Sequence, residues 1–169
     1  MRWIVSLLLL VLTAGPGTAQ IVPVWRIVTD VTASICPAMR DGDVDAAVRA
    51  AQSFGYRVDD GARPTAGIAG SGHYVVMDGR HFDRLTLAAS DGIAWCAISL
   101  QQATPRSVAD AADPHLARLG YRRLPGRGDD RIAWAGEDRE AAAFPTLTSR
   151  RLTTLALRFS TVGGRAPNP

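Results

Sequence analysis

Three apolar runs separated by Asp-Gly pairs are the feature that most constrains the fold of this chain. The runs are 73–77, 82–89 and 93–100, and the pairs between them are Asp78-Gly79 and Asp91-Gly92. Asp-Gly between apolar runs is typical of hairpins, because both central residues of a type I′ turn need a positive φ. The pattern therefore predicts an antiparallel meander. Its last strand is apolar on both faces, which favours a central position covered on both sides.

Helical spacing of apolar residues predicts two helices before this meander. The first runs from Val24 to Ile35 and ends at Cys36-Pro37, because the residue before a proline disfavours the helical conformation. The second begins after the N-cap residue Asp43 and ends at Gly55, which suits the left-handed position after a helix.

A third helix is predicted between Thr104, an N-cap residue followed by proline, and Gly120. Pro114 either kinks this helix or separates it from a second short one. Outside the meander, further extended segments are expected at 56–58, 121–124, 132–134 and 155–159.

Together these elements predict an α+β protein, with an antiparallel sheet of five or six strands and two or three helices mainly on one face. We expect a single domain over residues 20–162 and a flexible C-terminal tail over 163–169. Phe54-Gly55-Tyr56-Arg57 and Leu119-Gly120-Tyr121-Arg122 form a faint internal repeat. Either an old duplication or the ordinary chemistry of helix-to-strand junctions explains it.

The first nineteen residues predict export. A positive Met1-Arg2 precedes an apolar stretch of about ten residues, shorter than the roughly twenty that span a bilayer. Small residues Gly17 and Ala19 occupy the −3 and −1 positions of a signal-peptidase site, so residues 1–19 are expected to be a cleaved signal peptide. We therefore expect a periplasmic or secreted protein without a membrane span after cleavage.

Two cysteines, Cys36 and Cys96, are expected to form a disulfide, because exported proteins fold in oxidising compartments. They lie sixty residues apart, which excludes a C-x-x-C redox motif, and neither has zinc-type spacing to histidine.

The charge of the chain argues against a nucleic-acid partner. All nineteen basic residues are arginine, and removal of residues 1–19 lowers the formal net charge from +3 to about +2. Arginine without lysine, with abundant alanine and glycine, is typical of a GC-rich bacterial genome.

No catalytic, cofactor or metal site is assigned from the sequence, and whether the protein is an enzyme is left open. His73, Asp78, His81 and Asp83 are the only grouping of potential metal or hydrolytic residues, and an ordinary polar hairpin explains them better than a metal site does. A second cluster holds arginines that could bind an anionic ligand, interleaved with acids that would neutralise it: Arg122, Arg123, Arg127 and Arg131, with Arg150-Arg151 further on.

The function expected from these features is a non-catalytic periplasmic or secreted module that binds a protein or an envelope component. The alternative is a small exported hydrolase with a site built from the histidines and acids near the predicted hairpin. A concave site that collects those residues would favour the hydrolase, and an exposed apolar or arginine-rich patch would favour the binding module.

Overall fold

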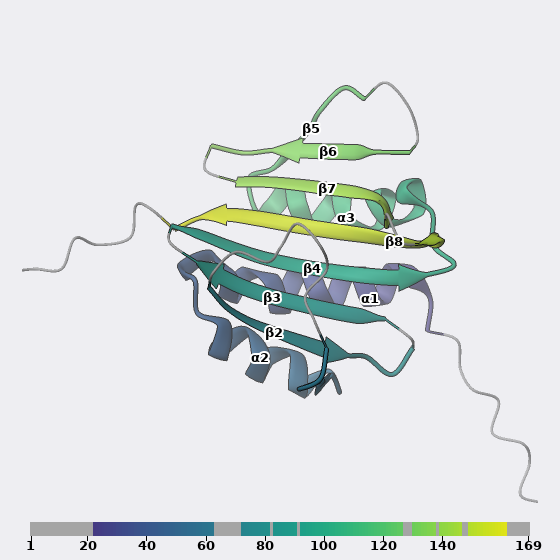
Figure 1. The fold of residues 1–169 in the computed structure, drawn as a ribbon. Helices are drawn as coiled ribbons and strands as arrows, with labels where there is room; N and C mark the ends of the chain where they lie inside the picture. Colours follow the sequence, from purple (N-terminus) through teal and green to yellow (C-terminus); the bar gives the residue numbers. More distant parts are fainter. Residues whose placement is uncertain are drawn as a thin grey trace, which may run out of the picture.

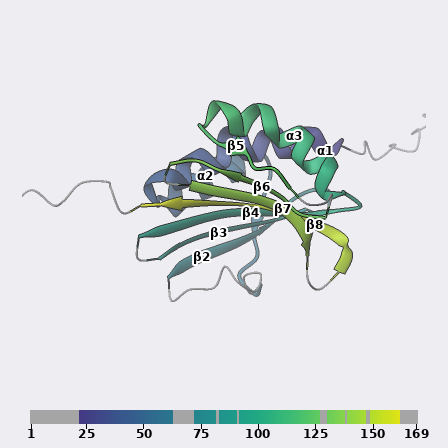
Figure 2. The same ribbon diagram turned by 90° about the horizontal axis from the view of Figure 1, so that it is seen from above.

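The described residues form one antiparallel sheet of eight strands, with three α-helices packed on one of its faces (Figure 1, Figure 2). The computed structural model describes residues 22–62, 72–81, 83–90, 92–126, 130–137, 139–146 and 149–161. The predicted signal peptide (1–19) and C-terminal tail (163–169) lie outside these residues. They stay predictions, as do the domain boundaries.

The sheet confirms the α+β class but exceeds the predicted five or six strands. Its spatial order is β1-β2-β3-β4-β8-β7-β6-β5. The strands are β1 (Arg57–Val58), β2 (His73–Asp78), β3 (Arg84–Ser90), β4 (Ile93–Gln101), β5 (Arg122–Arg123), β6 (Ile132–Ala135), β7 (Arg139–Thr146) and β8 (Ser149–Ser160).

The strand that the sequence did not predict is β7. It contains Glu140 followed by three alanines, residues that favour a helix and are depleted in strands. Pairing decides its conformation, because β7 bonds to β6 on one side and to β8 on the other. Tertiary context thus overrides a weak local preference.

The meander is confirmed, but only one of its two connections is a two-residue turn. Ser90 pairs with Ile93, and Gly92 between them has a φ of +75°, as the Asp-Gly signature predicts. The prediction of a type I′ turn at Asp78-Gly79 is wrong. Five residues separate Asp78 from Arg84, and Gly79 does not have a positive φ. Here the carboxylate of Asp83 packs against Gly79 and accepts a hydrogen bond from the His81 amide at 3.1 Å.

The second and third helices agree with their predicted ends. At the start of α2 (Val44–Ser53) the Asp43 carboxylate accepts a hydrogen bond from the Ala46 amide at 2.8 Å. Thr104 and Ser107 form a capping box at the start of α3 (Pro105–Arg118), which continues through Pro114 as one helix.

The first helical segment differs from its prediction, because the α-helix ends earlier and helical turns of other kinds continue beyond Ile35. After α1 (Val24–Asp30) the chain makes a π-helical turn (Val31–Ile35) and then a 3₁₀ turn (Cys36–Asp41). Pro37 was expected to end the helix. It is instead accommodated in the first turn of the 3₁₀ segment, where a missing N–H leaves no broken bond.

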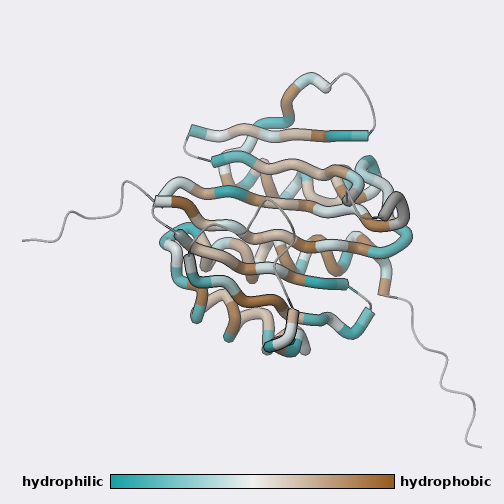
Figure 3. Tube along the Cα trace, viewed as in Figure 1, coloured by the Kyte–Doolittle hydropathy of each residue, from teal (hydrophilic) through white to brown (hydrophobic). Residues whose placement is uncertain are grey.

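The predicted disulfide between Cys36 and Cys96 is present, with a Cα–Cα distance of 5.5 Å. It connects the helical layer to β4, the strand that lies between β3 and β8. Both cysteines are fully buried in the core formed by the helices and the adjacent face of the sheet. Figure 3 shows hydrophobic residues along the strand interiors and hydrophilic residues mostly at strand ends and connections.

The two halves of the fold repeat one arrangement. A helix (α2 or α3) ends at a glycine of positive φ, Gly55 or Gly120, and four antiparallel strands follow. In each half the next residue, Tyr56 or Tyr121, is buried and its amide bonds back into the helix. The strand order is symmetric about the β4–β8 pair. The faint sequence repeat therefore coincides with a repeat of one helix and four strands, whereas α1 and the two helical turns after it belong to the first half alone among the described residues.

Candidate functional site

The structure separates His73 from the other three residues of the candidate hydrolytic site. His73 begins β2 and pairs with Ala89, whereas His81 and Asp83 follow the other end of that strand. The six residues of β2 place its two ends roughly 17 Å apart. Among the described residues, no three His, Cys, Asp or Glu side chains lie close enough to hold a metal ion.

The acids of this group have structural partners. Asp78 forms an ion pair with Arg84 at 2.9 Å. Asp83 is buried and accepts hydrogen bonds from the His81 amide and from the Tyr56 hydroxyl. Burial, together with the charge of Asp83, raises the pKa of Tyr56 well above its ordinary value, so the phenol remains protonated and donates. These contacts stabilise the β2–β3 connection.

The predicted arginine cluster is divided between two surfaces. Arg123 bonds to Asp113 at 2.7 Å and lies 3.5 Å from Asp110, on the side of α3. Arg131 instead extends over the ring of Phe144. Arg127 and the side chains of Arg150 and Arg151 lie outside the described residues.

The face of the sheet opposite the helices has an unusual composition. We call it the helix-free face, because every described helix lies on the other side (Figure 2). A sheet face without helices is ordinarily polar. Here a row of alanines crosses four neighbouring strands through the register pairs Ala97↔Ala156, Ala156↔Ala142 and Ala142↔Ala133. The expectation that β4 is covered on both sides is therefore not met by the helices.

Larger side chains flank this alanine row and form a groove over β6, β7 and β8. The groove has a volume of about 450 Å³. Trp95 and Phe144 are its aromatic walls, Leu124 lies at the β5 side, and Ala133, Ala142 and Ala156 are its floor. The floor of the groove comes from three consecutive strands, and Trp95 comes from β4, far from them in the sequence; the register of the sheet places these residues together.

Each aromatic wall of the groove carries an arginine. The guanidinium carbon of Arg158 lies 5.6 Å from the centre of the Trp95 ring, and that of Arg131 lies 6.0 Å from the centre of the Phe144 ring. Both distances are within the range of cation–π attraction. Arg158 also pairs with Glu140 at 3.3 Å. Within the part of the chain that the structure describes, no carboxylate lies within ion-pair distance of Arg131.

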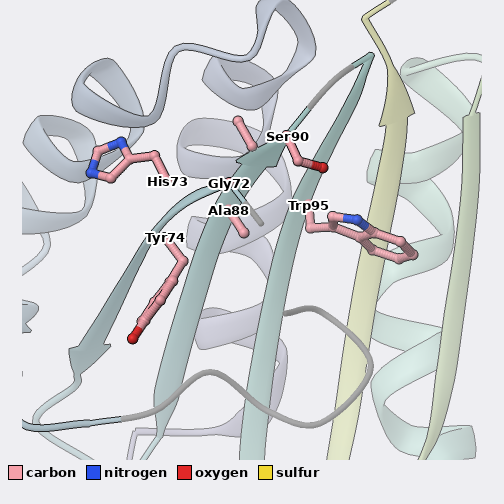
Figure 4. Close-up of a pocket in the computed structure, with 7 residues that line it drawn as sticks. Gly72, His73, Tyr74, Ala88, Ser90 and Trp95 are labelled. Carbon is pink, nitrogen blue, oxygen red and sulfur yellow. The ribbon is translucent and has the colours of Figure 1, made fainter. Parts of the chain in front are cut away.

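A second hollow on this face is too small for a ligand. It lies beside Tyr74, Ala88 and Trp95, and its volume is about 10 Å³, close to that of a single water. Figure 4 shows the Trp95 ring directed away from Tyr74 and toward β8, the yellow strand. Trp95 therefore belongs to the wall of the larger groove.

Sequence reasoning did not find the groove. One available signal was the alternation in β6 and β8, where Ala133 and Ala156 occupy positions that are usually polar on a sheet face without helices. Sequence alone could not show that these alanines share a row.

No helix in the described ranges has the length and hydropathy needed to cross a bilayer. No protein-family model matches the chain, and no curated protein or solved structure is significantly similar to it. A functional assignment must therefore come from the geometry of the groove.

Proposed function

We propose that the protein is an exported, non-catalytic binding module, and that the groove on the helix-free face holds its partner, an envelope component. The observation that carries the proposal is the alanine-floored groove with aromatic walls. The buried disulfide supports export, because such bonds persist in oxidising compartments.

The alanine row is poorly explained by stability alone. Alanine is depleted in strands, and larger β-branched residues would pack better on a pleated surface. Small residues instead lower the floor between Trp95 and Phe144 and leave an apolar concavity. A volume of about 450 Å³ is within the range of ligand-binding clefts.

The alternative, a small exported hydrolase, has weaker support. A general base must lie within hydrogen-bond reach of the group it serves. His73 lies at the opposite end of β2 from His81 and Asp83, and Asp83 is already engaged by Tyr56.

The test compares the purified protein with a variant whose groove is filled. Ala142→Leu adds a side chain in the middle of the floor, and Ala117→Leu, on the exposed surface of α3, is the matched control. Each protein is incubated with envelope extract, retained components are identified by mass spectrometry, and each is rebound in pure form.

We expect one component to bind again, in pure form and with 1:1 stoichiometry, to wild type and to Ala117→Leu. The same component should not bind to Ala142→Leu. Equal binding by Ala142→Leu contradicts the proposal. Turnover of ester or amide substrates that His81→Ala abolishes favours the hydrolase instead.

A further inference from the structure

We infer that the groove binds a small amphiphile with an apolar body and a single carboxylate, an inference that rests on the proposed function. The apolar body would lie along the alanine floor, and the carboxylate would pair with the guanidinium of Arg131. Shape and charge support this assignment independently.

The shape suits a narrow apolar molecule. Glu140 and Phe144 are four residues apart on β7, so the rows that contain the two walls are separated by roughly 14 Å along the strands. The alanine row lies midway between these rows, since Ala142 is two residues from each. The side chains of Trp95 and Phe144 narrow this space to a channel that crosses the strands.

The charge of the groove suits a monoanion. Arg158 is engaged twice, by the carboxylate of Glu140 and by the Trp95 ring. Arg131 is exposed, and among the described residues its one recorded contact is with the ring of Phe144, so its fork of N–H donors is available to a ligand. Two arginines and one glutamate leave a net charge of +1 in the groove.

One carboxylate neutralises this charge with the bidentate geometry that guanidinium groups favour. A phosphate monoester carries between one and a half and two negative charges near neutral pH and would leave part of its charge uncompensated. The apolar wall beside Arg131 would strengthen a pair formed there, because it excludes water from one side.

The test titrates the purified protein with dodecanoate, dodecanol and dodecyl phosphate below their micelle concentrations, by calorimetry. Tryptophan fluorescence gives a second readout, since Trp95 lines the groove. The matched variants are Arg131→Gln in the groove and Arg49→Gln on the exposed side of α2, each of which removes one positive charge. Ala142→Leu reports whether binding occurs in the groove.

We expect dodecanoate to bind 1:1 and at least tenfold more tightly than dodecanol or dodecyl phosphate. Arg131→Gln should weaken dodecanoate binding at least tenfold and leave dodecanol unchanged, and Arg49→Gln should change neither. Ala142→Leu should abolish all binding.

Dodecanol should bind less tightly than dodecanoate if the assignment is right. Equal binding of the two that Ala142→Leu abolishes and Arg131→Gln preserves overturns the carboxylate assignment and leaves the groove as the binding site. A preference for dodecyl phosphate also overturns it. Binding of none of the probes overturns the inference, and the envelope-extract experiment then decides the proposed function separately. A dimer in light scattering that Ala142→Leu dissociates would identify the occupant as a second copy of the chain and overturn the inference too.

Discussion

Removal of the disulfide should lower stability by an amount that follows from its position in the chain. Cys36 and Cys96 close a loop of sixty residues. In the chain-entropy account, a crosslink of that span destabilises the unfolded state by about 4 kcal/mol. A typical domain has a free energy of unfolding of about 5–15 kcal/mol. The variant Cys36→Ala/Cys96→Ala should therefore lose a large fraction of it.

The expected fall in the thermal midpoint is about 8–16 °C, at roughly 2–4 °C per kcal/mol for a chain of this size. Both cysteines are fully buried, so the lost volume adds to this fall. The measurement is thermal and urea unfolding by circular dichroism, with wild-type protein unfolded under reducing conditions as the control.

The urea slope m distinguishes the mechanism. An unfolded chain without the crosslink exposes more surface, so m should rise in the variant. A midpoint within about 3 °C of wild type, together with an unchanged m, would refute the reasoning, because the crosslink would then not restrict the unfolded chain.

Three further predictions concern single positions. The indole N–H of buried Trp134 donates a hydrogen bond to the Asp113 carboxylate at 2.6 Å. Asp113→Ala removes this acceptor and should lower the free energy of unfolding, measured in urea, by about 1–3 kcal/mol. Asp113→Asn keeps an oxygen acceptor and should lower it less. Gly120→Ala places a side chain at a φ of +84° and should lower the free energy of unfolding by about 1 kcal/mol. Gly61→Ala, where φ is not positive, should lower it little. Equal effects of the two substitutions would contradict the conformational argument. Burial lowers the pKa of His115, so the unfolded state binds its proton more readily, and the stability that neutral His115 contributes declines as pH falls through about 6.5. Unfolding curves at pH 8 and pH 5 should therefore show His115→Gln gaining on wild type in acid, and a constant difference would exclude this linkage.

Local chemistry explains why much of the fold was predictable. The residues that begin and end a helix interact only with backbone groups a few positions away. The structure shows four of them at helix ends: Asp43, Gly55, Thr104 and Gly120. Asp91-Gly92 was equally readable, because a two-residue hairpin needs a glycine of positive φ. The 79–83 connection was not, since its conformation depends on the contact of Asp83 with Gly79.

The candidate site was not predictable in the same way. The sequence directed attention to His73 and His81 because they carry recognisable chemistry, and the β2 strand holds them apart. The groove depends on alanines, which carry no chemical signature, and on Arg131 and Phe144, which the register of the sheet places together.

What the sequence determined by itself is a set of local features: the ends of the second and third helices, one tight turn, and two cysteines available for a bond. Only the tertiary structure decided that β7 is a strand and that Ala133, Ala142 and Ala156 share one row. The physical reason is that hydrogen bonding across a sheet is non-local. A strand's identity and the neighbours of its side chains depend on which residues of the adjacent strands pair with it, here those of β6 and β8 for β7, and a shift of one residue in register would turn those alanines to the other face.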